Sequence, residues 1–201
     1  MEAIRSFRMA IECLNSVAAP CSSESNVADF VELPTQSVPL ECLDMTTIMN
    51  ASPHNTFDIY QVAFCFPKVN DLVSFRTEIS VILFYNLALT HQLAGLLGAE
   101  ESQNHLRHAQ KFYKLALTVF KSTPGLNIDM GCFALVLGML TNMGHLFTHF
   151  WNPKDAAACR MHMQEILQSA AVMGLSDDDG EFFFSALAYS QSHDAVAAPA
   201  A

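Results

Sequence analysis

Two long stretches of the chain carry no Asp, Glu, Lys or Arg. They are residues 79–99 and 130–153. Each predicts a mostly buried helix, because helices that face water normally carry charges. In the second stretch the polar residues Thr141, Asn142, His145, Thr148 and His149 fall on one helical stripe. This one-sided polarity predicts a helix that is buried on one side and lines a wetter groove on the other.

Between these stretches, residues 101–121 follow the pattern of an amphipathic helix. Its apolar face is Leu106, Ala109, Phe112, Tyr113, Ala116, Leu117 and Phe120, and its basic face is Arg107, Lys111, Lys114 and Lys121. A fourth helix is predicted at about residues 154–173 from Cys159, Met163, Ile166, Leu167 and Ala170. Residues 1–15 predict one more, from Ile4, Phe7, Ile11 and Leu14.

Three segments predict strands. Residues 57–66 are rich in aromatic and β-branched residues and end before Pro67. Residues 40–48 are a weaker candidate for their hairpin partner. Residues 182–189 follow the turn cluster 177–180 and are a candidate for a third strand. The pattern as a whole predicts one mainly α domain over residues 1–201, with a loop and β-hairpin insert at about 16–70.

The uncharged stretches are long enough to cross a bilayer. Against this, each holds several Asn, Gln, His or Thr side chains, which are costly in hydrocarbon, and flanking positive charge is sparse. We therefore expect core helices and no membrane partner, with a two-span membrane protein as the less favoured alternative.

Composition narrows the class of protein. The chain has 201 residues, 51% of them hydrophobic and 15% charged, and a net charge of -10. This composition excludes wholesale disorder, and the acidic balance argues against a nucleic-acid partner. The six cysteines form no compact framework and no signal-peptide core opens the chain, so we expect reduced thiols and a cytoplasmic or nuclear location.

Several motifs resemble the tetratricopeptide (TPR) helix pair. Phe84-x2-Leu87-Ala88-x2-His91 and Leu140-x2-Met143-Gly144-x2-Phe147 resemble its first helix, and Ala109-x3-Tyr113-x2-Ala116 resembles its second. Ala3-x3-Phe7-x2-Ala10 looks like the second helix of a preceding pair. The chain is also similar to uncharacterised algal proteins with degenerate helix pairs. The resemblance implies a short solenoid of antiparallel helix pairs, in which Ala88, Gly138 and Gly144 let helices approach closely.

The resemblance also implies a concave surface lined by first helices. Asn86 and Asn142 align with an Asn that clasps a bound peptide's backbone in some TPR proteins, and the neighbouring groove positions include Thr141, His145 and His149. The Lys and Arg that clamp a terminal carboxylate in chaperone-binding relatives are not matched here. The alternative for both Asn side chains is hydrogen bonding between helices.

Other candidate chemistry is weak. His145 and His149 have metal-ligand spacing and Cys159-x2-His162 lies on the next predicted helix, but the HExxH motif lacks its glutamate, since Leu146 follows the first His. Residues 176–180 resemble a calcium loop but have adjacent rather than alternating acids, which predicts a solvated turn. No hydrolase elbow or phosphate-binding loop occurs. We expect no metal, no cofactor and no catalysis.

The sequence therefore favours a non-catalytic protein-interaction module or scaffold of the TPR-like kind, with a protein or peptide partner. The groove candidates are Asn86, Thr141, Asn142, His145 and His149. The basic residues Arg107, Lys111 and Lys114 are a second candidate surface, either for an acidic partner or for the acidic segment 12–67 of the same chain. Self-association through apolar helix faces is a further expectation. The alternative is a helical bundle that binds a metal or a small ligand.

Overall fold

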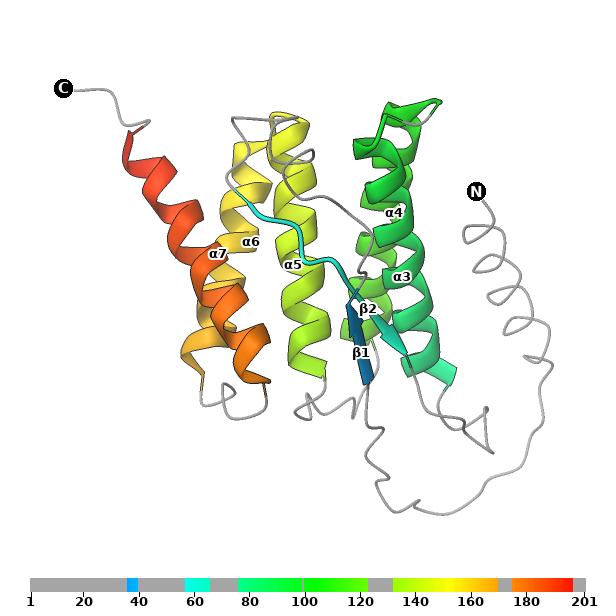
Figure 1. Cartoon of the computed structure of the whole chain (residues 1–201), viewed down its shortest axis with the longest axis horizontal. Helices are drawn as coiled ribbons and strands as arrows, with labels where there is room; N and C mark the ends of the chain where they lie inside the picture. The colour runs from blue at the N-terminus through cyan, green and yellow to red at the C-terminus, as the bar shows by residue number, and fades with distance from the viewer. Residues whose placement is uncertain are drawn as a thin grey trace, which may run out of the picture.

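The computed structural model describes residues 36–39, 57–65, 76–98, 100–122, 132–169 and 175–196. Within them five helices run alternately up and down: α3 (Arg76–Leu96), α4 (Ser102–Ser122), α5 (Cys132–His149), α6 (Pro153–Gln168) and α7 (Asp177–Val196) (Figure 1). The mainly α class predicted from the sequence is confirmed. The predicted helix at residues 1–15 lies outside the described residues.

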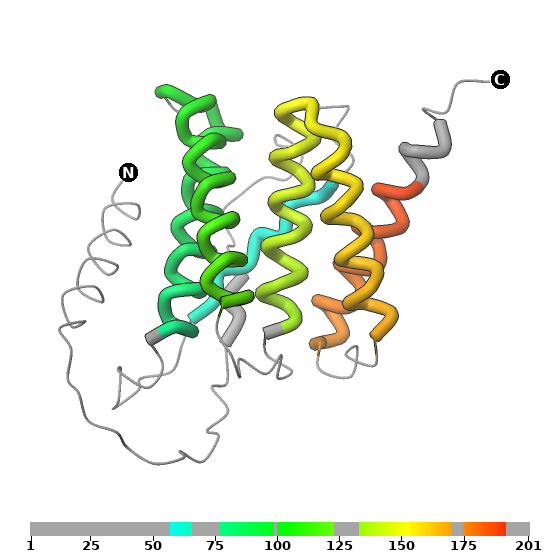
Figure 2. The backbone as a smooth tube through the Cα atoms, turned by 180° about the vertical axis from the view of Figure 1, so that it is seen from behind, coloured from blue at the N-terminus to red at the C-terminus, as the bar shows by residue number. Residues whose placement is uncertain are grey.

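The helices form two closely packed pairs and a final single helix. α3 packs along α4, α5 packs along α6, and α7 packs against α5 and α6. α3, α5 and α7 form one row, with α4 and α6 behind it, and residues 57–65 cross the opposite face of that row (Figures 1 and 2). This extended segment is therefore placed against the first helix of each pair.

Close packing within the first pair depends on small residues. A Cβ at Gly95 of α3 would come within 2.7 Å of Leu106 of α4, and Ala109 and Ala116 of α4 are fully buried. The second pair differs from the prediction. A Cβ on Gly144 would meet the Phe57 ring, and a Cβ on Gly138 would meet the Tyr60 ring and, at 3.1 Å, the Tyr85 hydroxyl of α3, so both glycines face residues 57–65 rather than α6.

The predicted strand at residues 182–189 is wrong, because these residues belong to α7. Phe183, Ala186, Leu187 and Ser190 are buried at positions i, i+3, i+4 and i+7, which is helical spacing. The predicted turn at residues 176–180 is the start of this helix. Ser176 Oγ accepts a hydrogen bond from the Asp179 amide at 3.1 Å, which caps the first turn.

The small β element joins different segments from those predicted. β2 (Val62–Cys65) lies within the predicted strand 57–66 but pairs antiparallel with β1 (Gln36–Pro39). The register places Ser37 opposite Phe64 and Val38 opposite Ala63. Residues 40–48, the predicted partner, lie outside the described residues.

The link between α5 and α6 is tight and contains an unusual residue. Trp151 has a φ of 55° and is 82% exposed. The amides of Trp151 and Asn152 donate to the carbonyls of Thr148 and Phe147, at 3.0 and 2.8 Å. Helices that end with these two hydrogen bonds usually have glycine at the position with positive φ, whereas here Trp151 takes it. Asn152 then caps α6, because its side chain accepts a hydrogen bond from the Asp155 amide.

Among the described residues, one helix segment, Thr77–Leu96, is long and apolar enough to cross a membrane. In this structure 72% of its most hydrophobic window is buried against the rest of the protein. Core helices and membrane spans share this composition.

Candidate peptide-binding site

Asn142 of α5 holds the backbone of Tyr60. Its Oδ1 accepts a hydrogen bond from the Tyr60 amide at 2.8 Å, and its Nδ2 donates to the Tyr60 carbonyl at 3.0 Å. Both bonds are buried, and the side chain of Asn142 has no solvent exposure. One amide side chain thus satisfies both main-chain groups of a single residue, as a neighbouring strand would.

Asn86 of α3 makes the same pair of bonds to Phe64. Its Oδ1 accepts from the Phe64 amide at 3.0 Å, and its Nδ2 donates to the Phe64 carbonyl at 2.7 Å. The two Asn side chains come from the first helix of each pair and grip residues four apart in one extended segment. This contact recognises main-chain groups and does not depend on the side chains of Tyr60 and Phe64.

Two glycines of α5 make room for the rings of this segment. A Cβ at Gly144 would overlap the Phe57 ring, and a Cβ at Gly138 would lie 2.6 Å from Cδ1 of Tyr60. Real side chains do not approach so closely, so only glycine lets these rings lie against the helix backbone. Phe57 and Tyr60 are accordingly 3% and 2% exposed.

The other end of the Tyr60 side chain contacts α7. Its ring centroid lies 5.2 Å from that of Phe182 and 4.6 Å from that of Phe183. Its hydroxyl donates to Asp179 Oδ1 at 2.5 Å, while Asp179 Oδ2 accepts from Ser176 Oγ at 2.6 Å. Burial, and then the bond to Asp179, raise the pKa of Tyr60 far above its usual value, so the phenol stays a donor.

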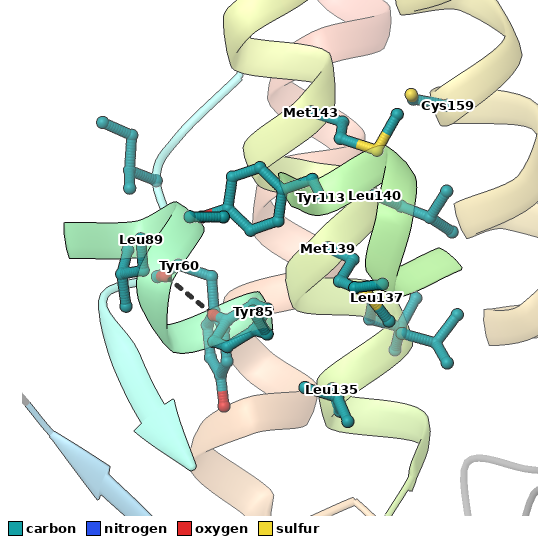
Figure 3. Close-up of a cluster of buried hydrophobic side chains, with 14 of the residues drawn as sticks. Tyr60, Tyr85, Leu89, Tyr113, Leu135, Leu137, Met139, Leu140, Met143 and Cys159 are labelled. Carbon is teal, nitrogen blue, oxygen red and sulfur yellow. Dashed lines mark hydrogen bonds between the residues drawn. The ribbon is translucent and has the colours of Figure 1, made fainter. Parts of the chain in front are cut away.

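Tyr85 of α3 contacts the middle of the extended segment 57–65. Its hydroxyl lies 3.1 Å from the Val62 carbonyl and 3.4 Å from the Tyr60 carbonyl, the contact drawn as a dashed line in Figure 3. Its ring meets the Phe64 ring edge-on, with centroids 5.1 Å apart. Burial raises the pKa of Tyr85 as well, which keeps this donor protonated.

A buried polar network holds Asn142 in position. Asn142 Nδ2 donates to the Tyr113 hydroxyl at 2.9 Å, and that hydroxyl donates to Gln92 Oε1 at 3.0 Å. Gln92 Nε2 lies 3.3 Å from His145 Nδ1. Burial raises the pKa of Tyr113, and burial with the nearby His149 lowers the pKa of His145 to about 3. The network is therefore uncharged near neutral pH, which suits its buried position.

Of the groove candidates from the sequence, Asn86 and Asn142 both bind the main chain of residues 57–65. Thr141 points elsewhere: its hydroxyl donates to the Leu137 carbonyl at 2.8 Å and lies 3.5 Å from the Met163 sulfur of α6. It is fully buried between the two helices of its pair.

The two histidines of the predicted stripe also make contacts between helices. His145 is 4% exposed and lies beside Gln92 of α3. His149 is half-buried, and its Nε2 lies 3.4 Å from Gln103 Nε2 of α4. The polar stripe is thus divided among three neighbours: the extended segment, the α3–α4 pair and α6.

Sequence reasoning did not identify Phe57, Tyr60, Asp179 or the role of the two glycines. The signal that could have found the first two is the run 57–66 itself, which is aromatic and β-branched and lies directly before the first uncharged helix. An isolated strand of this kind needs a partner for its main-chain groups. The sequence contained no local clue that helix side chains would supply that partner.

The basic face of α4 is exposed. Arg107, Lys111 and Lys114 lie on the outer side of a helix whose sequence contains no acidic residue. Lys114 Nζ also lies 5.3 Å above the Phe147 ring of α5. The first two side chains of this face are the better candidates for contact with an acidic partner.

The residues that the sequence offered for a metal site have different surroundings. Cys159 is buried, and burial together with Asp155 raises the pKa of its thiol to about 12, whereas His162 is exposed with Nδ1 3.1 Å from Glu165 Oε2. In the part of the chain that the structure describes, no three His, Cys, Asp or Glu side chains could hold one metal ion.

Comparison with known proteins gives no relative to set beside this geometry: no family model matches the chain, and neither the curated proteins nor the solved structures contain a match.

Proposed function

We propose that this protein is a non-catalytic protein-interaction module built on TPR-like helix pairs. Its binding site is the face of α3, α5 and α7, and its ligand is an extended polypeptide segment of a protein partner. The observation that carries this proposal is the pair of Asn clamps. Asn86 and Asn142 each bind the amide and carbonyl of one residue in an extended chain.

The clamps support peptide binding because they are spaced for a main chain. Main-chain hydrogen bonds supply affinity in strand-type recognition, and pockets for particular side chains supply specificity. Here the glycines of α5 provide such pockets beside the clamps. The exposed Arg107 and Lys111 add a surface that suits an acidic region of the same partner.

The test uses the full chain with Phe57→Leu. This substitution weakens the packing of residues 57–65 on α5 while it keeps an apolar side chain at position 57. A fluorescent peptide that copies residues 55–66, with Ser for Cys65, is titrated and followed by polarisation. N-methylation of the peptide at Tyr60 removes the N–H group that donates a hydrogen bond to Asn142 Oδ1. We therefore expect the affinity of the peptide to fall at least about tenfold, which corresponds to the loss of one strong hydrogen bond.

The matched control is N-methylation at Ile59, whose amide makes none of the clamp bonds. A smaller effect there supports backbone recognition at Tyr60. Equal effects at the two positions, or no binding of the unmodified peptide to a folded variant, would exclude this site as a peptide groove.

A further inference from the structure

The segment 57–65 fills the proposed groove with a definite pattern of side chains. Phe57, Ile59, Tyr60 and Phe64 are buried, whereas the side chains between them are half-buried and Cys65 is exposed. The buried positions follow the order aromatic-x-aliphatic-Tyr-x3-aromatic. The groove is therefore complementary to a sequence pattern as well as to a main chain.

The first position of the pattern requires a flat ring. Gly144 offers bare backbone where its Cβ would overlap Phe57, and the Arg160 guanidinium lies over the same ring, 5.6 Å from its centroid. A ring lies against bare backbone with a large contact area, whereas a branched aliphatic side chain leaves part of that surface uncovered.

The tyrosine position requires a hydroxyl. The Tyr60 phenol donates to Asp179, whose other oxygen is already used by Ser176 at the start of α7. Phenylalanine would leave a half-buried carboxylate without this donor. A phosphorylated tyrosine would place a second anion beside the half-buried Asp179 carboxylate, and the two negative charges would repel each other. The pocket thus selects unmodified tyrosine.

One position of the segment is poorly suited to the groove. Asp58 is half-buried, and burial raises its pKa, which means that the site disfavours its charge. A competing segment with a neutral residue there escapes this penalty. A chain from outside can therefore match the fit of residues 57–65 and improve on it at this position.

We propose that residues 57–65 are a built-in competitor for the groove, and that the partner segment which displaces them repeats the pattern aromatic-x-aliphatic-Tyr-x3-aromatic with an unphosphorylated tyrosine. This inference rests on the proposed function, because it names the ligand class of the same site. Only molecules with an open groove can bind a partner. The apparent affinity is therefore the affinity of the open groove multiplied by the fraction of molecules in which the groove is open.

The experiment compares the wild-type chain with its Phe57→Leu variant, using the 55–66 peptide with Asn for Asp58 and Ser for Cys65. Weakening the internal segment should raise peptide affinity about tenfold, because more molecules have an open groove. Cys65→Ser in the chain is the matched control, since this exposed side chain anchors nothing in the groove, and it should leave affinity unchanged. If the segment were only structural, Phe57→Leu would lower peptide affinity or leave it unchanged.

A second measurement covers the case in which Phe57→Leu does not fold. Hydrogen exchange of the wild-type chain is followed by mass spectrometry with saturating peptide. We expect residues 57–65 to lose protection while α5 and α6 keep theirs. Peptide bound without that loss would overturn displacement.

Peptide variants separate this inference from the proposed function. Replacing the peptide's tyrosine by phenylalanine should weaken binding about tenfold, and phosphotyrosine should weaken it further. If all three peptides bind alike, the groove recognises main chain only, and the pattern is wrong while the proposed function stands. If none binds to a variant that melts cooperatively, both proposals fail.

Discussion

Glycine-to-alanine substitutions in the helices should have opposite signs at different sites, depending on whether a ring of residues 57–65 covers the glycine. In an exposed helix position, alanine stabilises by about 0.5–1 kcal/mol because it restricts the unfolded chain and favours the helix. Gly180 of α7 has nothing within 4 Å of an added Cβ, so Gly180→Ala should raise the free energy of unfolding by this amount.

At Gly144 the same gain is opposed by overlap. The added Cβ would collide with the ring of Phe57, which is 3% exposed and is also covered by Arg160. Overpacking of this kind costs about 1–3 kcal/mol. With the helix gain deducted, Gly144→Ala should lower the free energy of unfolding by about 0.5–2 kcal/mol. Gly138→Ala should follow it, because its Cβ would lie 2.6 Å from the Tyr60 ring.

The assay is urea unfolding followed by far-ultraviolet circular dichroism, with the slope of the transition compared among variants. A double-mutant cycle then assigns the cause. When Phe57→Leu removes the ring, Gly144→Ala should lose most of its penalty, giving a coupling of about 1 kcal/mol or more. If Gly144→Ala stabilises as much as Gly180→Ala, residues 57–65 do not lie on α5 and the groove assignment fails.

Three other variants test separate parts of the structure. Asn142→Ala should lower the free energy of unfolding by about 2–4 kcal/mol, because it removes both hydrogen bonds to Tyr60 and leaves the buried Tyr60 amide without an acceptor; a loss below about 1 kcal/mol in urea unfolding would contradict the clamp. Trp151→Gly should stabilise by about 1 kcal/mol in the same assay, since Trp151 has a φ of 55° and is 82% exposed; unchanged or lower stability would show that the ring makes a compensating contact. His145 has a folded pKa of about 3, below its unfolded value of 6.5, so the unfolded state binds more protons between these pH values. Its contribution is complete above about pH 6.5 and is lost as pH falls, by up to about 1.4 kcal/mol per pH unit. Thermal melts from pH 7 to 4 should show a shallower loss for His145→Gln, and equal slopes would contradict the buried neutral imidazole.

The helices on which residues 57–65 lie, and those behind them, were predictable because their signals are local. The ranges 79–99, 101–121 and 154–173 lie within a few residues of α3, α4 and α6, and α5 falls inside 130–153. Apolar positions that recur every three or four residues reveal a helix without knowledge of its neighbours. The same logic failed at α7, where Phe182, Phe183 and Phe184 suggested β propensity although the cap at Ser176 and the burial of Phe183 and Ala186 follow a helix.

Only one side of the candidate site could be predicted, namely the two Asn side chains and not the residues that they bind. The sequence by itself singled out Asn86 and Asn142, because the helix motifs place both at corresponding positions. What they bind was decided by the tertiary structure alone, since Asn86 and Phe64 are 22 residues apart and Asn142 and Tyr60 are 82 apart. Periodicity reports which side of a helix is buried, but it carries no information about which distant segment covers that side. That choice was made by the fit of two rings to two glycines and of main-chain groups to two amides, and these contacts exist only once the chain has folded.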